Sequence, residues 1–229
     1  MKIGITERGD ACFHPWINLH GCDGLILISK NIGMLMEQID PFLYDKIILH
    51  ATITGWGGTA IEPNVPMSGS MIEAFNKINF PQERLVLRVD PIVPSEFGVD
   101  NAIEVINKSR PDCRVRISFM DAYDHVRERM KDIDLISWDG FHAPLVRRQM
   151  FLEKIKEETG RTIEVCGEPD IECTGCVSAL DLKALGLEAD NNTSGWQRPA
   201  CACIGIKKEL LKEKTRCPHK CLYCYWKGD

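Results

Sequence analysis

Runs of apolar, β-prone residues alternate with amphipathic segments along most of this 229-residue chain. Continuous apolar runs are typical of parallel strands that helices cover. The predicted strands span residues 2–6, 24–29, 46–53, 84–90, 113–119 and 162–167. The predicted helices span residues 31–43, 68–79, 99–110, 121–132 and 142–159. Six strands joined by helical crossovers predict an α/β fold, namely a (β/α)6 partial TIM-type barrel.

Residues that favour helix ends agree with these boundaries. They are the N-cap candidates Asn31, Ser68 and Asp121, the first-turn proline Pro144 and the terminal glycine Gly160. A chain of this length buries one sizeable core, so we expect a single domain.

The end of the chain contains three cysteines in a CxxxCxxC arrangement, Cys217, Cys221 and Cys224, with Tyr223 directly before the third. Three thiolate ligands leave one iron of a 4Fe-4S cube free to bind a non-protein ligand. The alternative is a structural zinc site, although such sites usually contain two CxxC pairs.

This motif resembles the cluster motif of the radical S-adenosylmethionine (SAM) superfamily, in which SAM binds the open iron. In most members the motif follows the first barrel strand, so its C-terminal position here implies a circular permutation. The chain is most similar to an uncharacterised bacterial radical-SAM-like family with a C-terminal motif, and distantly similar to spore photoproduct lyase. Besides the final motif, the resemblance rests on residues 29–31, 52–57, 61–63, 83–84, 88–92, 117–119, 197–198 and 201–203.

Five further cysteines lie within or after the last predicted strand, and four thiolates suffice for a second iron–sulfur cluster or a tetrahedral zinc. The resemblance implies an auxiliary 4Fe-4S cluster with one spare cysteine, Cys173. Its implied ligands are Cys166, Cys176, Cys201 and Cys203. A structural zinc bound by any four of the five is the alternative. We expect a barrel core over residues 1–165, with an iron–sulfur segment, residues 166–229, packed on its mouth.

Polar side chains follow the predicted strands, where the carboxyl ends of parallel strands meet at the barrel mouth. SAM needs partners for its carboxylate, ammonium and ribose groups. The candidate cofactor-binding residues are Lys30, Thr54, Arg88, Asp90, Ser118, Glu168 and Tyr223. Lys30 and Arg88 suit the SAM carboxylate or an anionic substrate, whereas Asp90 or Glu168 suits the ammonium or the ribose. An internal ion pair is the alternative for Arg88 and Asp90, which share one face of a strand.

Charge and cysteine usage restrict the partners. The net charge of −5 argues against sequence-independent binding to duplex DNA, although residues 198–229 carry eight Lys or Arg against three acids. That basic tail suits an anionic substrate, or forms a solvated helix face. No run approaches the ~20 apolar residues that cross a bilayer, so no membrane partner is expected. Eleven cysteines without a leader peptide predict a cytoplasmic protein, in which Cys12, Cys22 and Cys113 are buried small hydrophobes.

The resemblance implies a function. A radical SAM enzyme reductively cleaves SAM at its 4Fe-4S cluster and uses the 5′-deoxyadenosyl radical to abstract a hydrogen atom, here in an isomerase-type or lyase-type reaction. A flavodoxin or ferredoxin would supply the electron. The expected substrate is a nucleobase or modified nucleotide, for example a hypermodified thymine in phage-type DNA. An amino acid, peptide or small metabolite is the first alternative, and a non-catalytic iron–sulfur or zinc module that binds a partner is the second.

Overall fold

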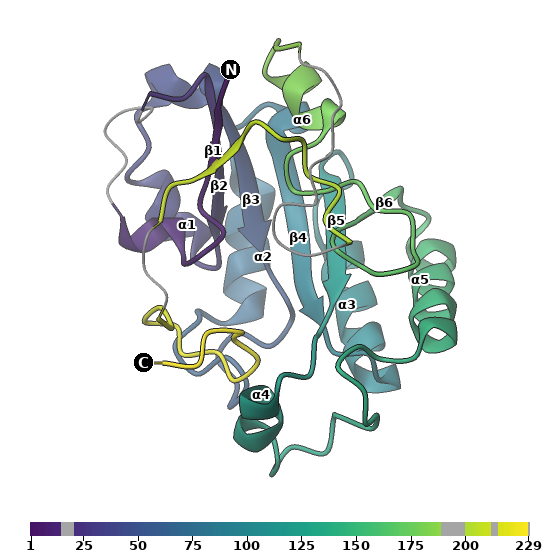
Figure 1. The fold of residues 1–229 in the computed structure, drawn as a ribbon. Coiled ribbons are helices and arrows are strands. Elements are labelled where there is room, and N and C mark those ends of the chain that lie inside the picture. The colour runs from purple at the N-terminus through teal and green to yellow at the C-terminus, as the bar shows by residue number, and fades with distance from the viewer. Residues whose placement is uncertain (15–20, 189–199, 212–214, 229) are drawn as a thin grey trace.

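A computed structural model describes residues 1–14, 21–188, 200–211 and 215–228. Seven parallel strands form one curled sheet, a half-barrel with the order β6-β5-β4-β3-β2-β1-β7 (Figure 1). The strands are β1 (Ile3–Ile5), β2 (Gly24–Ser29), β3 (Ile47–Thr52), β4 (Leu85–Ile92), β5 (Arg114–Phe119), β6 (Ile163–Val165) and β7 (Lys207–Glu209). The α/β partial barrel is therefore confirmed, with seven strands rather than the six predicted.

The seventh strand gave no apolar signal. Its sequence is Lys-Lys-Glu, and it pairs only with β1 at the edge of the sheet. An edge strand of three residues is held by backbone hydrogen bonds, so its side chains need not be apolar. Because β7 joins the same sheet as β1 to β6, the barrel takes a strand from the segment after residue 165.

Six α-helices connect or cover the described strands. They are α1 (Ile32–Met36), α2 (Ser68–Lys77), α3 (Glu96–Lys108), α4 (Asp124–Arg129), α5 (Leu145–Thr159) and α6 (Ala179–Ala184). Short 3-10 turns occupy Ala11–Phe13, Pro41–Lys46 and Gln82–Arg84. The predicted helix over residues 31–43 stops at Met36, and a separate 3-10 turn begins at Pro41 after the extended Asp40.

Two of the predicted caps are confirmed. Asn31 accepts a hydrogen bond from the Met34 amide, and Gly160 ends α5 in the left-handed conformation. Ser68 is instead the first residue of α2, and its hydroxyl accepts the Gly57 amide hydrogen bond.

The other two predicted caps were also misplaced. Asp121 lies three residues before α4 and bonds His142, so that helix begins later than predicted. Pro144 occupies the N-cap of α5 rather than its first turn. The contact of Asp121 with His142 precedes α4, and the fixed φ of Pro144 precedes α5.

The two faces of the sheet have different covers. Helices α1, α2, α3 and α5 pack on the outer face around residues such as Leu49 and Leu87. The inner face carries Ile48 and Val86, and it is covered by the segment that contains Cys166, Cys176 and Cys203. In Figure 1 this segment, green to yellow, crosses in front of the strands. Among the described residues, no helix combines the length and apolar character that a bilayer crossing requires.

Candidate functional site

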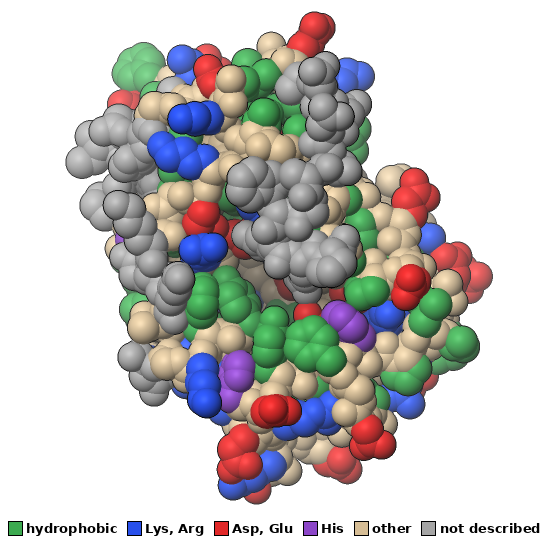
Figure 2. All heavy atoms as spheres, viewed as in Figure 1, with side chains coloured by type: hydrophobic (Ala, Val, Ile, Leu, Met, Phe, Trp, Pro, Cys, Tyr) green, Lys and Arg blue, Asp and Glu red, His purple; other side chains and the backbone are tan. Residues whose placement is uncertain are grey.

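The C-terminal residues after 215 lie at the carboxyl ends of the strands, next to α4 (Figure 1). Two contacts join them to the loop that follows β3. The Leu222 amide donates to the Ile61 carbonyl at 2.9 Å, and Asn64 Nδ2 donates to the Pro218 carbonyl at 2.8 Å. Figure 2 shows hydrophobic side chains gathered on the lower half of the same face, with charged side chains around them. The CxxxCxxC motif is thus held at the barrel mouth.

One arginine from α4 binds three carbonyls of the tail. Arg129 Nη1 donates to the Cys224 carbonyl at 2.8 Å, and Nη2 donates to the carbonyls of Trp226 and Lys227, both at 2.9 Å. The planar guanidinium presents several donors in a fixed arrangement, which a lysine ammonium does not. Arg129 therefore fixes the backbone that carries the last cysteine of the motif.

Replacing Arg129 with lysine should loosen this backbone. Loss of the three bonds should cost about 2 to 4 kcal/mol of docking free energy and reduce the iron bound on reconstitution several-fold. Arg127→Lys is the matched control, since Arg127 lies on the same helix but donates to the Gly140 carbonyl. Iron and sulfide per chain are measured after desalting. Equal losses in the two variants would contradict a specific role for Arg129.

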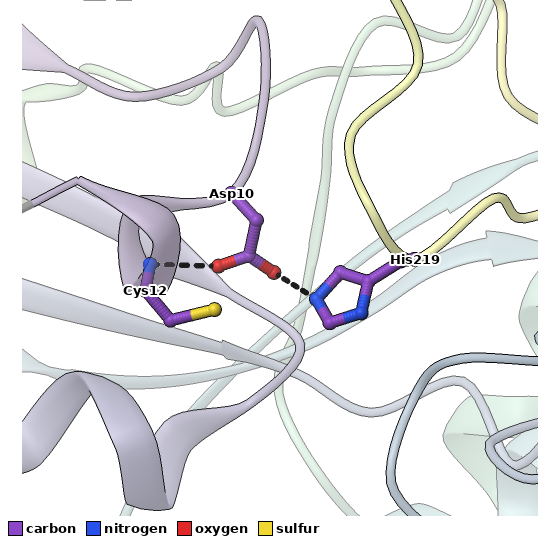
Figure 3. Close-up of side chains that lie close together, drawn as sticks. All are labelled: Asp10, Cys12 and His219. Carbon is purple, nitrogen blue, oxygen red and sulfur yellow. Dashed lines mark hydrogen bonds and ion pairs between the residues drawn. The ribbon is translucent and has the colours of Figure 1, made fainter. Parts of the chain in front are cut away.

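A second contact ties the motif to the loop after β1. His219 Nε2 lies 2.8 Å from Asp10 Oδ2 (Figure 3). Its Nδ1 lies 3.1 Å from the Asn64 carbonyl oxygen. Both ring nitrogens thus face oxygen acceptors. The Asp10 carboxylate also accepts the amides of Cys12 at 3.0 Å and Lys30 at 2.7 Å.

The Asp10, Cys12 and His219 donor atoms lie within 4.8 Å of one another, which is the spacing of a metal-ion site. Their polar atoms are already engaged with one another and with the backbone, so an ion would have to displace the Asp10–His219 bond. Burial raises the Asp10 pKa, but the charge and hydrogen bond of His219 outweigh it and hold the pKa below its usual value. We interpret the group as a tether that joins the motif to the loop after β1.

Asp10→Asn should weaken this tether and change the pH dependence of folding. A depressed carboxyl pKa contributes stability above the unfolded pKa of about 3.9, and that stability is lost as pH falls through the folded pKa. The wild type should therefore lose stability below about pH 4 more steeply than the variant, which should already be about 2 kcal/mol less stable at neutral pH. Denaturant unfolding at pH 3 to 7 measures both effects. Parallel pH profiles for the two proteins would contradict this role of Asp10.

Lys30 and Tyr223, both predicted to bind the cofactor, are brought together beside the motif. Lys30 Nζ lies 2.7 Å from the Tyr223 hydroxyl oxygen and 2.8 Å from Glu62 Oε1, and Tyr223 also donates to Glu62. Burial opposes the charge on Lys30, but the Glu62 carboxylate and the Cys221 thiol hold its pKa above the usual value. A partly buried cation, a buried carboxylate and a phenol therefore lie next to Cys221.

The three motif thiols differ in exposure. Cys221 is 5% exposed, whereas Cys217 and Cys224 are half-buried. Burial raises the pKa of all three thiols, so a cation is needed to hold them as thiolates. Within the described part of the chain, they do not meet the spacing for a shared single ion.

The four cysteines of the implied auxiliary cluster gather on the inner face of the sheet. Cys166 Sγ and Cys176 Sγ are 3.0 Å apart, and the Cys176 amide donates to Cys203 Sγ at 3.2 Å. Cys203 also interacts with the Cys201 side chain. Contact with Cys176 and burial raise the Cys166 pKa well above its usual value. Although its bond to Cys166 acts in the opposite direction, contact with Cys203 and burial raise the Cys176 pKa to about 12.

The fifth cysteine of this region points elsewhere. Cys173 Sγ lies 3.3 Å from the carbonyl oxygens of both Glu168 and Ile171, and it accepts the Glu168 amide at 3.2 Å. The thiol therefore closes a local turn. The assignment of Cys173 as the spare cysteine stays a prediction.

Charged side chains surround the auxiliary group. Lys207 Nζ lies 3.7 Å from Cys203 Sγ and also pairs with Glu7, whose Oε1 is 3.6 Å from Cys176 Sγ. Arg116 Nη1 donates to the Cys176 carbonyl at 3.2 Å. These charges act in both directions on the thiols: Lys207 favours the charged form of Cys203, whereas Glu7 disfavours the charged form of Cys176, and both thiol pKa values stay above the usual value.

The remaining predicted cofactor residues divide into two sets. Arg88 pairs with Asp90, which also accepts the Ser118 hydroxyl, so these three lie together on the inner face. The ion pair considered for Arg88 and Asp90 is therefore present.

Thr54 and Glu168 are engaged separately. Thr54 Oγ1 accepts the Trp56 amide at 3.3 Å. Glu168 accepts the Phe119 amide at 2.7 Å and pairs with Arg148 on α5 at 3.0 Å. Burial raises the Glu168 pKa to about 7. Both side chains thus have local bonding roles at the strand ends.

A family model matches most of the chain, including both cysteine groups. That model, described as a domain of unknown function (DUF1848), matches residues 16–226. The chain belongs to the DUF1848 family. No curated protein and no solved structure matches it significantly. Within this DUF1848 protein, Asp10 and Cys12 lie before the matched range, whereas their partner His219 lies inside it.

Three residues of the site were not predicted: Asp10, Glu62 and Arg129. Asp10 follows the first strand, and Glu62 lies within a stretch that carried the family resemblance. The position of each residue in the sequence could therefore have suggested it as a site residue. Arg129 gave none, because an arginine near the end of a helix usually faces solvent. Of the basic tail residues, Arg198, Lys212 and Lys214 lie outside the described residues.

Proposed function

We propose that this DUF1848 protein is a radical SAM enzyme. The cofactor chemistry would be reductive cleavage of SAM at a 4Fe-4S cluster, giving a 5′-deoxyadenosyl radical that abstracts a hydrogen atom from the substrate. Cys217, Cys221 and Cys224 would hold that cluster. Cys166, Cys176, Cys201 and Cys203 would hold a second one.

The strand order is the observation that carries this proposal. In spatial order β7 precedes β1, and the CxxxCxxC motif follows β7 along the chain. The superfamily usually places its motif after the first barrel strand. The same spatial arrangement would arise here from a permuted chain, with the motif still at the mouth formed by the strand ends.

Residues around the motif have the chemistry that SAM requires. Lys30 offers a cation for a carboxylate, and Glu62 offers acceptors for an ammonium or a ribose hydroxyl. Tyr223 packs in an apolar cluster with Trp56 and Cys221, which would keep water from the reacting groups. A flavodoxin or ferredoxin would deliver the electron to this cluster.

For the substrate we propose a nucleobase or modified nucleotide. The described basic side chains of the tail, including Lys220 and Lys227, support this class by charge. An amino acid, peptide or small metabolite is the alternative, favoured by the acidic balance of the whole chain. A non-catalytic iron–sulfur or zinc module is the third candidate.

The test is anaerobic reconstitution with iron and sulfide, followed by dithionite and SAM, with 5′-deoxyadenosine as the product. Product that requires both the cluster and SAM supports the proposal. If the purified protein retains zinc and forms no 5′-deoxyadenosine after reconstitution, the result would favour the non-catalytic binding module. Among active preparations, salt-dependent binding of a single-stranded oligonucleotide would separate the nucleotide substrate from the small metabolite.

A further inference from the structure

Three buried polar atoms on the inner face of the sheet have no hydrogen-bond partner among the described residues. They are His50 Nδ1 and Thr52 Oγ1 on β3, and Arg88 Nε on β4. His50 is fully buried and Thr52 is 5% exposed. Buried polar atoms are nearly always paired in folded proteins, so a group of three orphans indicates a missing partner.

The three side chains share one face and adjoin one another. Ile48, His50 and Thr52 alternate with residues of the outer core, so they point to the inner face. Thr52 and Arg88 are paired in register between neighbouring parallel strands. Their side chains therefore lie side by side.

All three groups can donate to the same ligand. His50 Nε2 lies 3.4 Å from Arg116 Nη1, which can only donate, so Nε2 accepts and Nδ1 carries the proton. Burial and the charges of Arg116 and Arg88 lower the His50 pKa far below its usual value, which keeps the ring neutral. The orphans are thus an imidazole N–H, a hydroxyl and a guanidinium N–H. An oxygen acceptor satisfies all of them, and the arginines favour one that is negatively charged.

We infer that His50, Thr52 and Arg88 bind a carboxylate or phosphate oxygen of the substrate on the inner face below the barrel mouth. This inference rests on the proposed function, since it assigns the substrate class to that site. Lys30 is the cation beside Cys221 and suits the SAM carboxylate. Arg88 interacts instead with Asp90 and with the thiols of Cys166 and Cys176, on the side of the auxiliary group. A ligand held by the three donors would therefore lie between the two cysteine groups, where a substrate would meet SAM.

Anion binding to the reconstituted protein tests this site directly. The melting temperature is measured anaerobically in inorganic phosphate, in acetate and in chloride at matched ionic strength, each with and without SAM. At roughly ten times its Kd, the preferred anion should raise Tm by about 3 to 6 °C above chloride. A response to phosphate alone assigns a phosphorylated substrate, and a response to acetate assigns a carboxylate.

Thr52→Val removes one donor while keeping the shape of the side chain, and should weaken anion binding about tenfold. Arg88→Lys keeps the charge but removes Nε, and should also weaken it. Ser109→Ala is the matched control, because it removes a buried hydroxyl that bonds the Val105 carbonyl on α3, and it should leave the anion response unchanged.

Several results would overturn the inference. One is a melting temperature in phosphate and in acetate that is no higher than in chloride. Another is an unchanged anion response in Thr52→Val and Arg88→Lys. The third is loss of the anion response in saturating SAM, which would show that the three donors bind SAM. Assay of 5′-deoxyadenosine on the same samples separates the two proposals. Formation of 5′-deoxyadenosine without anion binding would reject the anion site alone. Anion binding without 5′-deoxyadenosine would reject the radical SAM function alone.

Discussion

Alanine in place of Cys221 should reduce 5′-deoxyadenosine formation to the level of a sample without protein. Cys221 is the central and most buried thiol of the motif, and its surroundings include Lys30 and Tyr223. With two thiols left, the proposed cluster would lack one of the three protein ligands that it requires. The loss should accordingly be complete rather than partial. Product is measured by liquid chromatography after reconstitution and reduction under the same conditions as the wild type.

Cys22→Ala is the control for this result. Cys22 is similarly buried, at 7% exposure, but belongs to neither cysteine group. This variant should keep product formation within about twofold and lose only about 1 kcal/mol of stability from the small cavity. Full activity in Cys221→Ala would contradict the proposed ligand set. Equal losses in both variants would show that the first result reflects folding alone.

The sequence predicted the fold best where burial controls residue choice. Strands β2, β3 and β5 are buried along nearly all of their length, so their apolar runs identified them closely. The prediction missed β7 because backbone pairing at an edge requires no apolar side chain. It also missed α6, where a six-residue helix depends on a capping box between Ser178 and Asp181.

The candidate site divides in the same way. Cysteine spacing pointed to two groups because thiols at short intervals carry their own chemical signature. Asp10, Glu62 and Arg129 carry none. Asp10 meets His219 over 209 positions, Glu62 meets Tyr223 over 161 positions, and Arg129 meets Cys224 over 95 positions. Only the fold brings such pairs together, so even where position in the sequence marks Asp10 and Glu62, no local pattern identifies their partners.

Removal of Cys176 should have a different and equally large effect, namely the loss of one cluster with retention of the other. Cys176 lies between Cys166 and Cys203, and Arg116 holds its carbonyl. Cys176→Ala should lower bound iron from about eight to about four atoms per chain, the difference of one 4Fe-4S cluster. The motif at the C-terminus keeps its three thiols, so uncoupled cleavage of SAM should persist. Turnover of a substrate held near Arg88 should be lost.

Cys173→Ala tests whether iron loss is specific to the proposed metal ligands or follows removal of any cysteine in this region. The Cys173 thiol bonds to the backbone of its own turn, so its removal should leave about eight irons per chain and cost only local stability. Equal iron loss in both variants would contradict the ligand assignment. About four irons and one zinc per wild-type chain would instead indicate the zinc alternative, because a tetrahedral ion takes the same four thiolates. The comparison works because the two cysteines are three positions apart in the chain but have different partners.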